Sequence, residues 1–131
     1  MRAPEPKVAR EVAESEVRSW AEVLGTSFDP AAAGPIVAAV MAGRVIFDAA
    51  SESFTVQLRK PIKLENGKAI DSLTIGEPTG GQILAAGKLK DQVSQSYSLL
   101  ASVTGLDSPA LIERMVQRDI TVASGLLGFF A

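Results

Sequence analysis

The feature that most constrains the fold is a change in the spacing of apolar residues along the chain. Phe54, Val56 and Leu58 alternate with polar residues, whereas apolar residues before position 43 and after position 79 recur every three or four positions. A period of two is typical of a half-buried strand, and a period near 3.6 is typical of an amphipathic helix. The order helices, strands, helices predicts an α+β fold, with a small antiparallel sheet of two hairpins between N-terminal helices and a C-terminal helical half.

The strands are expected to form two consecutive hairpins. The first joins residues 44–48 to residues 54–58, and the second turns at Glu65–Lys68, where an Asn-Gly pair tolerates positive φ. The return strand departs from strict alternation near Asp71-Ser72, which predicts a β-bulge there. Pro61 has no N–H group and therefore predicts an edge position or the start of a new strand.

Two helices are predicted before the sheet. The first covers about residues 7–24 and ends at Gly25, because glycine readily adopts the left-handed conformation that ends helices. The second is Ala-rich and starts either at Asp29-Pro30, as N-cap and first residue, or at Pro35. The apolar stripe of the first helix is expected to be buried; it consists of Val8, Val12, Val17, Trp20 and Leu24.

The C-terminal half is expected to be helical throughout. Thr79 is predicted as an N-cap, with Gln82 completing a capping box. Gly105 ends this helical stretch, a short helix restarts at Ser108-Pro109, and Asp119 is expected to cap the last helix. The first stripe, with a break near Asp91, consists of Ile83, Leu84, Gly87, Val93, Tyr97, Leu100 and Val103; the last helix has a face of Ile120, Ala123, Leu127 and Phe130.

Length and composition limit the class of protein. The 131 residues fit one domain, with residues 1–42 as a helical N-terminal extension, residues 43–76 as the hairpins and residues 77–131 as the helical part. The chain has no Cys and no His, which excludes disulfides, thiolates and imidazole bases. A net charge of −2 with scattered Lys and Arg disfavours nucleic acid as a partner. The longest apolar run is shorter than the roughly 20 residues of a membrane span, and the N-terminus lacks a signal-peptide pattern, so a cytoplasmic protein without a membrane partner is expected.

Three groups of residues allow more than one interpretation. Glu65, Asp71 and Glu77 are best explained by turns and caps, and acid–base chemistry by two of them is the alternative. Gly80-Gly81 is best explained by helix-cap geometry, and anion binding is the alternative. No catalytic, cofactor or metal motif is present. Four large apolar residues crowd the C-terminus, where they either dock onto the domain or form a partner-binding surface, or do both with different faces: Leu126, Leu127, Phe129 and Phe130.

Several short motifs occur in a fixed order between Phe54 and Phe130. They are a strand ending in Leu-x-x-Pro, a hairpin, the run Leu-Thr-Ile-x-x-Pro-Thr-Gly opening a helix, a Thr-Gly-Leu turn before a proline, and an Asp-led final helix with an apolar tail. This series resembles the tail assembly chaperones of contractile-tailed, Mu-like phages, with residues 1–42 outside the pattern. The residues that carry the resemblance are Pro61, Leu73, Thr74, Ile75, Glu77, Pro78, Thr79, Gly80, Gly105, Leu106 and Asp119.

The resemblance implies a small, non-enzymatic cytoplasmic protein without cofactors. Such a chaperone would bind the tape measure protein before the tail tube polymerises, with the tail tube protein as a further partner, and would form a homo-oligomer absent from the mature virion. A longer form made by ribosomal frameshifting near Phe129-Phe130 is also implied. The alternative is a virion structural protein, such as a tail tube, terminator or connector subunit, although these usually carry longer sheets.

Overall fold

The computed structural model describes residues 9–27, 33–106 and 109–130. Its centre is an antiparallel sheet with the strand order β1-β2-β3, built from β1 (Val45–Asp48), β2 (Ser53–Lys63) and β3 (Ala69–Ile75). Helices precede and follow this sheet in the chain. The predicted α+β class, with N-terminal helices and a C-terminal helical half, is therefore confirmed.

The period of two in β2 has the expected consequence. Phe54, Val56 and Leu58 are buried, whereas Thr55 and Gln57 between them are exposed. Because side chains alternate across a strand, one face of the sheet is apolar and the other faces solvent. The neighbouring strands extend the apolar face with Val45, Leu73 and Ile75.

The bulge lies at the predicted place in the ladder but on the opposite strand. Gln57 pairs with Ser72 and Ile62 pairs with Ile70, so the extra residues are on β2, opposite Asp71. Strand β2 runs through Pro61 without a new start. Pro61 is tolerated in this central strand because the pairing of β2 with β1 extends only from Ser53 to Val56, so the missing N–H disrupts no bond to β1.

Helices α1 (Arg10–Leu24) and α2 (Gly34–Met41) form the N-terminal part. Gly25 ends α1 with φ 72°, as predicted, and α2 begins beside Pro35; Asp29-Pro30 lies outside the described residues. The predicted stripe of α1 is only partly correct, because Val12 is 56% exposed and Val8 lies outside the described residues. Successive residues of a helix point about 100° apart. The buried face of α1 is centred nearer to Ala13 than the predicted stripe, so Val12 falls outside it. The buried residues are Ala13, Val17, Trp20 and Ala21, with Leu24 half-buried.

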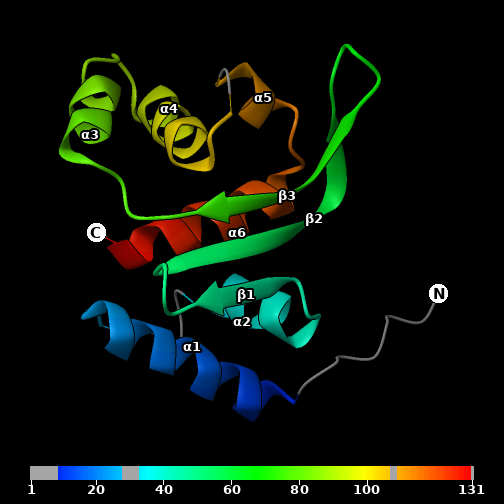
Figure 1. The fold of residues 1–131 in the computed structure, drawn as a ribbon, viewed down its shortest axis with the longest axis vertical. Helices are drawn as coiled ribbons and strands as arrows, with labels where there is room; N and C mark the ends of the chain where they lie inside the picture. The colour runs from blue at the N-terminus through cyan, green and yellow to red at the C-terminus, as the bar shows by residue number, and fades with distance from the viewer. Residues whose placement is uncertain (1–8, 28–32, 107–108, 131) are drawn as a thin grey trace.

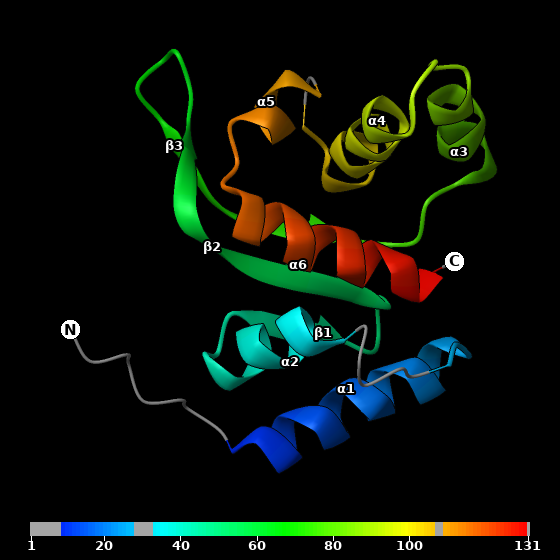
Figure 2. The same ribbon diagram turned by 180° about the vertical axis from the view of Figure 1, so that it is seen from behind.

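The C-terminal part consists of α3 (Gly80–Gly87), α4 (Gln92–Thr104), α5 (Ala110–Glu113), α6 (Gln117–Leu127) and the short 3₁₀ helix η1 (Gly128–Phe130). Helices α3, α4 and α5 lie beyond β3, and α1 lies beyond β1 at the other end of the molecule (Figure 1). Helices α2 and α6 lie together against one face of the sheet (Figure 2). The break between α3 and α4 falls beside Asp91, as predicted.

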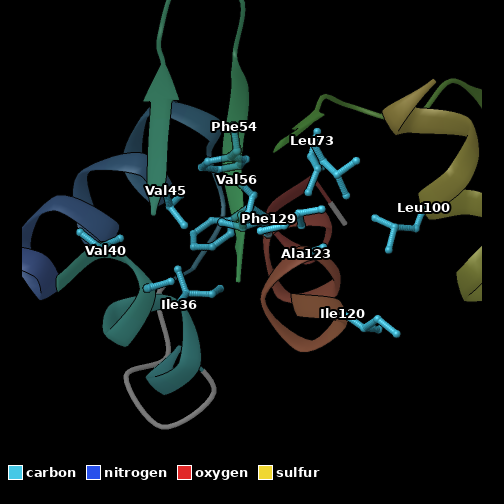
Figure 3. Packing of buried hydrophobic residues seen from close by; sticks show 14 of the residues in the cluster. Ile36, Val40, Val45, Phe54, Val56, Leu73, Leu100, Ile120, Ala123 and Phe129 are labelled. Carbon is cyan, nitrogen blue, oxygen red and sulfur yellow. The ribbon is translucent and has the colours of Figure 1, made fainter. Parts of the chain in front are cut away.

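An aromatic cluster joins the N-terminal helix to the C-terminus through the sheet. The ring centroid of Phe54 lies 4.9 Å from that of Phe47 and 5.4 Å from that of Trp20. On the other side, Phe54 lies 5.6 Å from Phe129 and 5.8 Å from Phe130. Figure 3 shows Phe54 and Phe129 within the wider apolar core that β2, α2 and α6 share. The residues before β1 therefore pack into the same core as the C-terminal helix.

Candidate functional site

The family-motif residues around the β3–α3 connection are structural. Leu73 and Ile75 are buried in the sheet, Thr74 between them is exposed, and Glu77 is exposed while Pro78 is half-buried. The Thr79 hydroxyl accepts the Gln82 N–H at 3.1 Å, and the Gln82 amide oxygen accepts the Thr79 N–H at 2.9 Å. Both bonds of the predicted capping box are present, so Gly80 is held as the first residue of α3.

Asp119 does not cap the last helix, which corrects the prediction. Helix α6 begins at Gln117 after Val116, so Asp119 lies within its first turn. The residue is only 3% exposed, and its carboxylate faces the bulge of β2 instead. The Asp119 carboxylate accepts the Arg59 N–H at 3.0 Å with each oxygen, and one oxygen accepts the Lys60 N–H at 3.3 Å.

This carboxylate brings together Pro61 and Asp119, two of the residues that carry the resemblance, at one place in the fold. The bulge interrupts β2–β3 pairing, and a buried N–H without an acceptor is unfavourable. Asp119 accepts the N–H groups of Arg59 and Lys60, and Pro61 has no N–H to satisfy. A further strand could not pair with these N–H groups, so this stretch of β2 is protected against strand addition.

A second bond ties the start of α6 to the same strand. The Arg114 guanidinium donates to the Lys63 carbonyl at 2.9 Å. Together with Asp119, it fixes the end of β2 to the segment that precedes and opens α6.

At the end of α4, Gly105 has φ 75° and the Leu106 N–H donates to the Ala101 carbonyl, while Leu106 is half-buried against the core. The motif residues Gly105 and Leu106 thus end α4, as predicted.

The four C-terminal apolar residues pack mainly inside the chain. Leu126 is fully buried and Phe129 is nearly so, whereas Leu127 and Phe130 are half-buried against the core. The buried apolar residues of α6 are therefore Ile120, Ala123 and Leu126. The predicted face was correct for Ile120 and Ala123, whereas Leu126 takes the fully buried place predicted for Leu127. Only Leu127 and Phe130 expose a substantial fraction of their side chains to a partner.

Exposed apolar residues gather instead on α3 and on the segment that leads into α4. Helix α3 packs mainly on α4 and buries only Ala86, although its sequence is largely apolar. The sequence placed Ile83, Leu84 and Val93 in one helical stripe and did not single out Leu89. We call the exposed set the α3–α4 surface: Ile83, Leu84, Leu89 and Val93, whose exposed fractions are 55%, 67%, 39% and 60%.

The cap of α4 explains why the expected stripe is divided. The Asp91 carboxylate accepts the Ser94 N–H and hydroxyl, each at 2.8 Å, and starts a new helix with a different orientation. These bonds lower the pKa of the Asp91 carboxyl from its usual value of 3.8, and the bond from the Ser94 backbone N–H has the larger effect. The Asp-x-x-Ser spacing was the sequence signal that could have separated the two helices. Lys88 and Lys90 flank Leu89 and are exposed, so the α3–α4 surface has basic neighbours.

The described residues hold no catalytic or metal-binding arrangement. Glu65, Asp71 and Glu77 are all exposed, and no group of three or more potential ligands is placed to bind a metal ion in the described parts of the chain. No helix of the described residues is long and apolar enough to cross a membrane. The α3–α4 surface offers apolar side chains for contact.

An exposed apolar surface on a small α+β domain is typical of proteins that bind other proteins. The family model of phage tail assembly chaperone proteins, described as E, or 41 or 14, matches residues 55–131, which is more than half of the chain. The chain belongs to this family of non-enzymatic phage tail assembly chaperones. Neither the curated proteins nor the solved structures include a match. The match excludes α1, α2 and β1, in agreement with the motif series that begins in β2.

Proposed function

We propose that this protein binds the tape measure protein during tail assembly and covers its apolar helical segments until tube subunits replace the chaperone. The observation that carries this proposal is the α3–α4 surface. Four large apolar side chains exposed on a small protein are unfavourable in water and are typical of an interaction site. An amphipathic helix of the partner would pack its apolar face against them.

The test compares two substitutions at residues of nearly equal exposure. Leu84 on α3 is 67% exposed and Ile46 on β1 is 66% exposed. Each is replaced by glutamate, and the protein is co-expressed with the tape measure protein encoded in the same tail gene cluster. We expect Leu84→Glu to abolish co-purification and Ile46→Glu to preserve it, with both variants folded by circular dichroism. Equal capture by the two variants would refute the assignment of this surface.

Leu127 and Phe130 are proposed as a second contact with the partner. Both are half-buried, whereas Leu126 is fully buried; Leu127 is the last residue of α6 and Phe130 the last of η1. Leu127→Ser is the suitable test, because a change at Leu126 would disrupt the core instead. Reduced capture of the tape measure protein with an unchanged melting temperature would support the contact, and unchanged capture would oppose it.

The finer points of the family role belong to the same proposal. We expect a homo-oligomer in the host cytoplasm, with the tail tube protein as a further partner, and no copies in mature particles. Mass spectrometry of purified virions distinguishes this chaperone from a virion structural protein, which would be present in stoichiometric amounts. A frameshifted long form requires a slippery run of nucleotides near the Phe129 and Phe130 codons and an overlapping downstream frame. A gene without either would make only the short form.

A further inference from the structure

A groove separate from the α3–α4 surface lies between α2, β2 and the start of α6. Its volume is about 270 Å³. That size suits one or two side chains better than a drug-sized ligand, whose pockets span roughly 300–1,000 Å³. Its walls are mostly small and apolar, and include Ala38, Ala39, Val56 and Val122. Figure 2 shows α2 and α6 on the same side of the sheet, where they bound this groove.

Three arginines line the groove and come from separate parts of the chain. Arg44 precedes β1, Arg59 lies in the bulge of β2, and Arg118 is in the first turn of α6. Among the described residues an ion pair is seen between Arg10 and Glu14 on α1. The three arginines of the groove form no ion pair with any described acidic residue. With Asp119 the lining carries three positive charges and one negative charge, so the groove is net positive in a chain whose net charge is −2.

The one acidic residue that lines the groove forms no ion pair with these arginines, although its negative charge offsets part of theirs. Asp119 is buried, and its oxygens accept the N–H groups of Arg59 and Lys60. An arginine fork is suited to carboxylates, which it can bind through two parallel hydrogen bonds. Small apolar walls beside such forks suit an apolar side chain next to a carboxylate. An extended phosphate backbone would require a longer basic stripe than this short groove provides.

We propose that this groove binds a protein segment in which acidic side chains alternate with apolar ones, as a further site by which the proposed chaperone recognises its partner. Part of the groove, including Arg44 and the α2 residues, lies outside the region shared with the family, residues 55–131. The N-terminal extension therefore contributes directly to recognition. This proposal depends on the proposed function only for the identity of the partner. The kind of segment that binds follows from the residues of the groove alone.

The probe is a fluorescent decapeptide of alternating Glu and Leu, with a Gln-Leu decapeptide as its uncharged counterpart. Fluorescence anisotropy gives the affinity, and methyl NMR of Val56 and Val122 reports binding in the groove. We expect the Glu peptide to bind at least tenfold more tightly than the Gln peptide and to shift both methyl signals. The double variant Arg44→Gln/Arg118→Gln should weaken the Glu peptide at least tenfold, which corresponds to about 1.4 kcal/mol.

The matched control is Lys88→Gln/Lys90→Gln, which removes the same charge beside the α3–α4 surface. It should leave the affinity for the Glu peptide within about twofold. Lys88 and Lys90 do not line the groove, and salt screens the attraction between exposed charges that are not in contact. An equal loss in both double variants, or unmoved Val56 and Val122 signals, would overturn the proposal. So would a change in sedimentation mass caused by the arginine variant without peptide, because a second copy of the chain would then occupy the groove. Leu84→Glu should leave peptide binding in the groove unchanged. A failed peptide assay would therefore refute only this proposal, and failed capture of the tape measure protein would refute only the proposed function.

Discussion

Replacing Asp119 by alanine removes the acceptor of two backbone N–H groups. Asp119 is 3% exposed, and its carboxylate lies against the bulge of β2, at 3.0 Å from the Arg59 nitrogen and 3.3 Å from the Lys60 nitrogen. Alanine leaves both N–H groups without their acceptor and leaves a gap between α6 and β2. We therefore expect the main effect on the free energy of unfolding, with little change in helix content.

The size of the effect follows from these bonds. A hydrogen bond to a charged group contributes about 1.5–3 kcal/mol, so two donors give about 3–6 kcal/mol. The side chains of Arg59 and Lys60 are exposed, so water can replace part of this loss. We expect Asp119→Ala to lower the free energy of unfolding by about 3 kcal/mol. A domain of this kind has about 5–15 kcal/mol in total, so the variant should still fold.

Urea unfolding, followed by circular dichroism, measures the loss, and two controls identify its cause. Asp71→Ala removes an exposed acid opposite the same bulge and should change stability by about 0.5 kcal/mol or less. Asp119→Glu keeps a negative charge in the first turn of α6 but moves the carboxylate by one methylene. If Asp119 acted mainly through the helix dipole, about 0.3–1 kcal/mol would be at stake and the glutamate variant would be neutral. A neutral Asp119→Glu, or equal losses for the two alanine variants, would refute the reasoning.

Three further predictions concern stability and titration. Thr79→Ala should cost about 1 kcal/mol in urea unfolding, because it removes one bond of the capping box; an unchanged midpoint would contradict it. Trp20→Ala should cost about 3–5 kcal/mol by losing contacts with Phe47 and Phe54, while the exposed Val12→Ala should cost little; similar losses would show that the buried face of α1 is misplaced. The pKa of Asp91, followed by carboxyl NMR, should lie below 3.8. Because the folded pKa is the lower one, this cap stabilises α4 fully above pH 3.8 and is lost as the pH falls through the folded pKa; a midpoint at or above 3.8 would disprove this.

Local chemistry determined much of this fold without tertiary information. The alternation of Phe54, Val56 and Leu58 fixed the buried face of β2, because a strand has a side-chain period of two. The capping box at Thr79 and the left-handed glycines at positions 25 and 105 fixed helix ends, because their partners lie within a few residues. The motif series from the Leu-x-x-Pro strand to the last helix identified the family for the same reason: it is a matter of order and spacing along the chain.

Only the tertiary structure decided which surfaces are buried and which remain open. Asp119 reads locally as a helix cap, but its partner Arg59 is 60 residues away and becomes available only when β2 bulges beside α6. Leu84 has the same character as the buried Leu126, yet α3 packs mainly on α4 and leaves Leu84 exposed. Periodicity gives the direction of a side chain around its own helix. Whether another element covers that direction depends on how the helices pack on the sheet, which residues far apart in the sequence determine together.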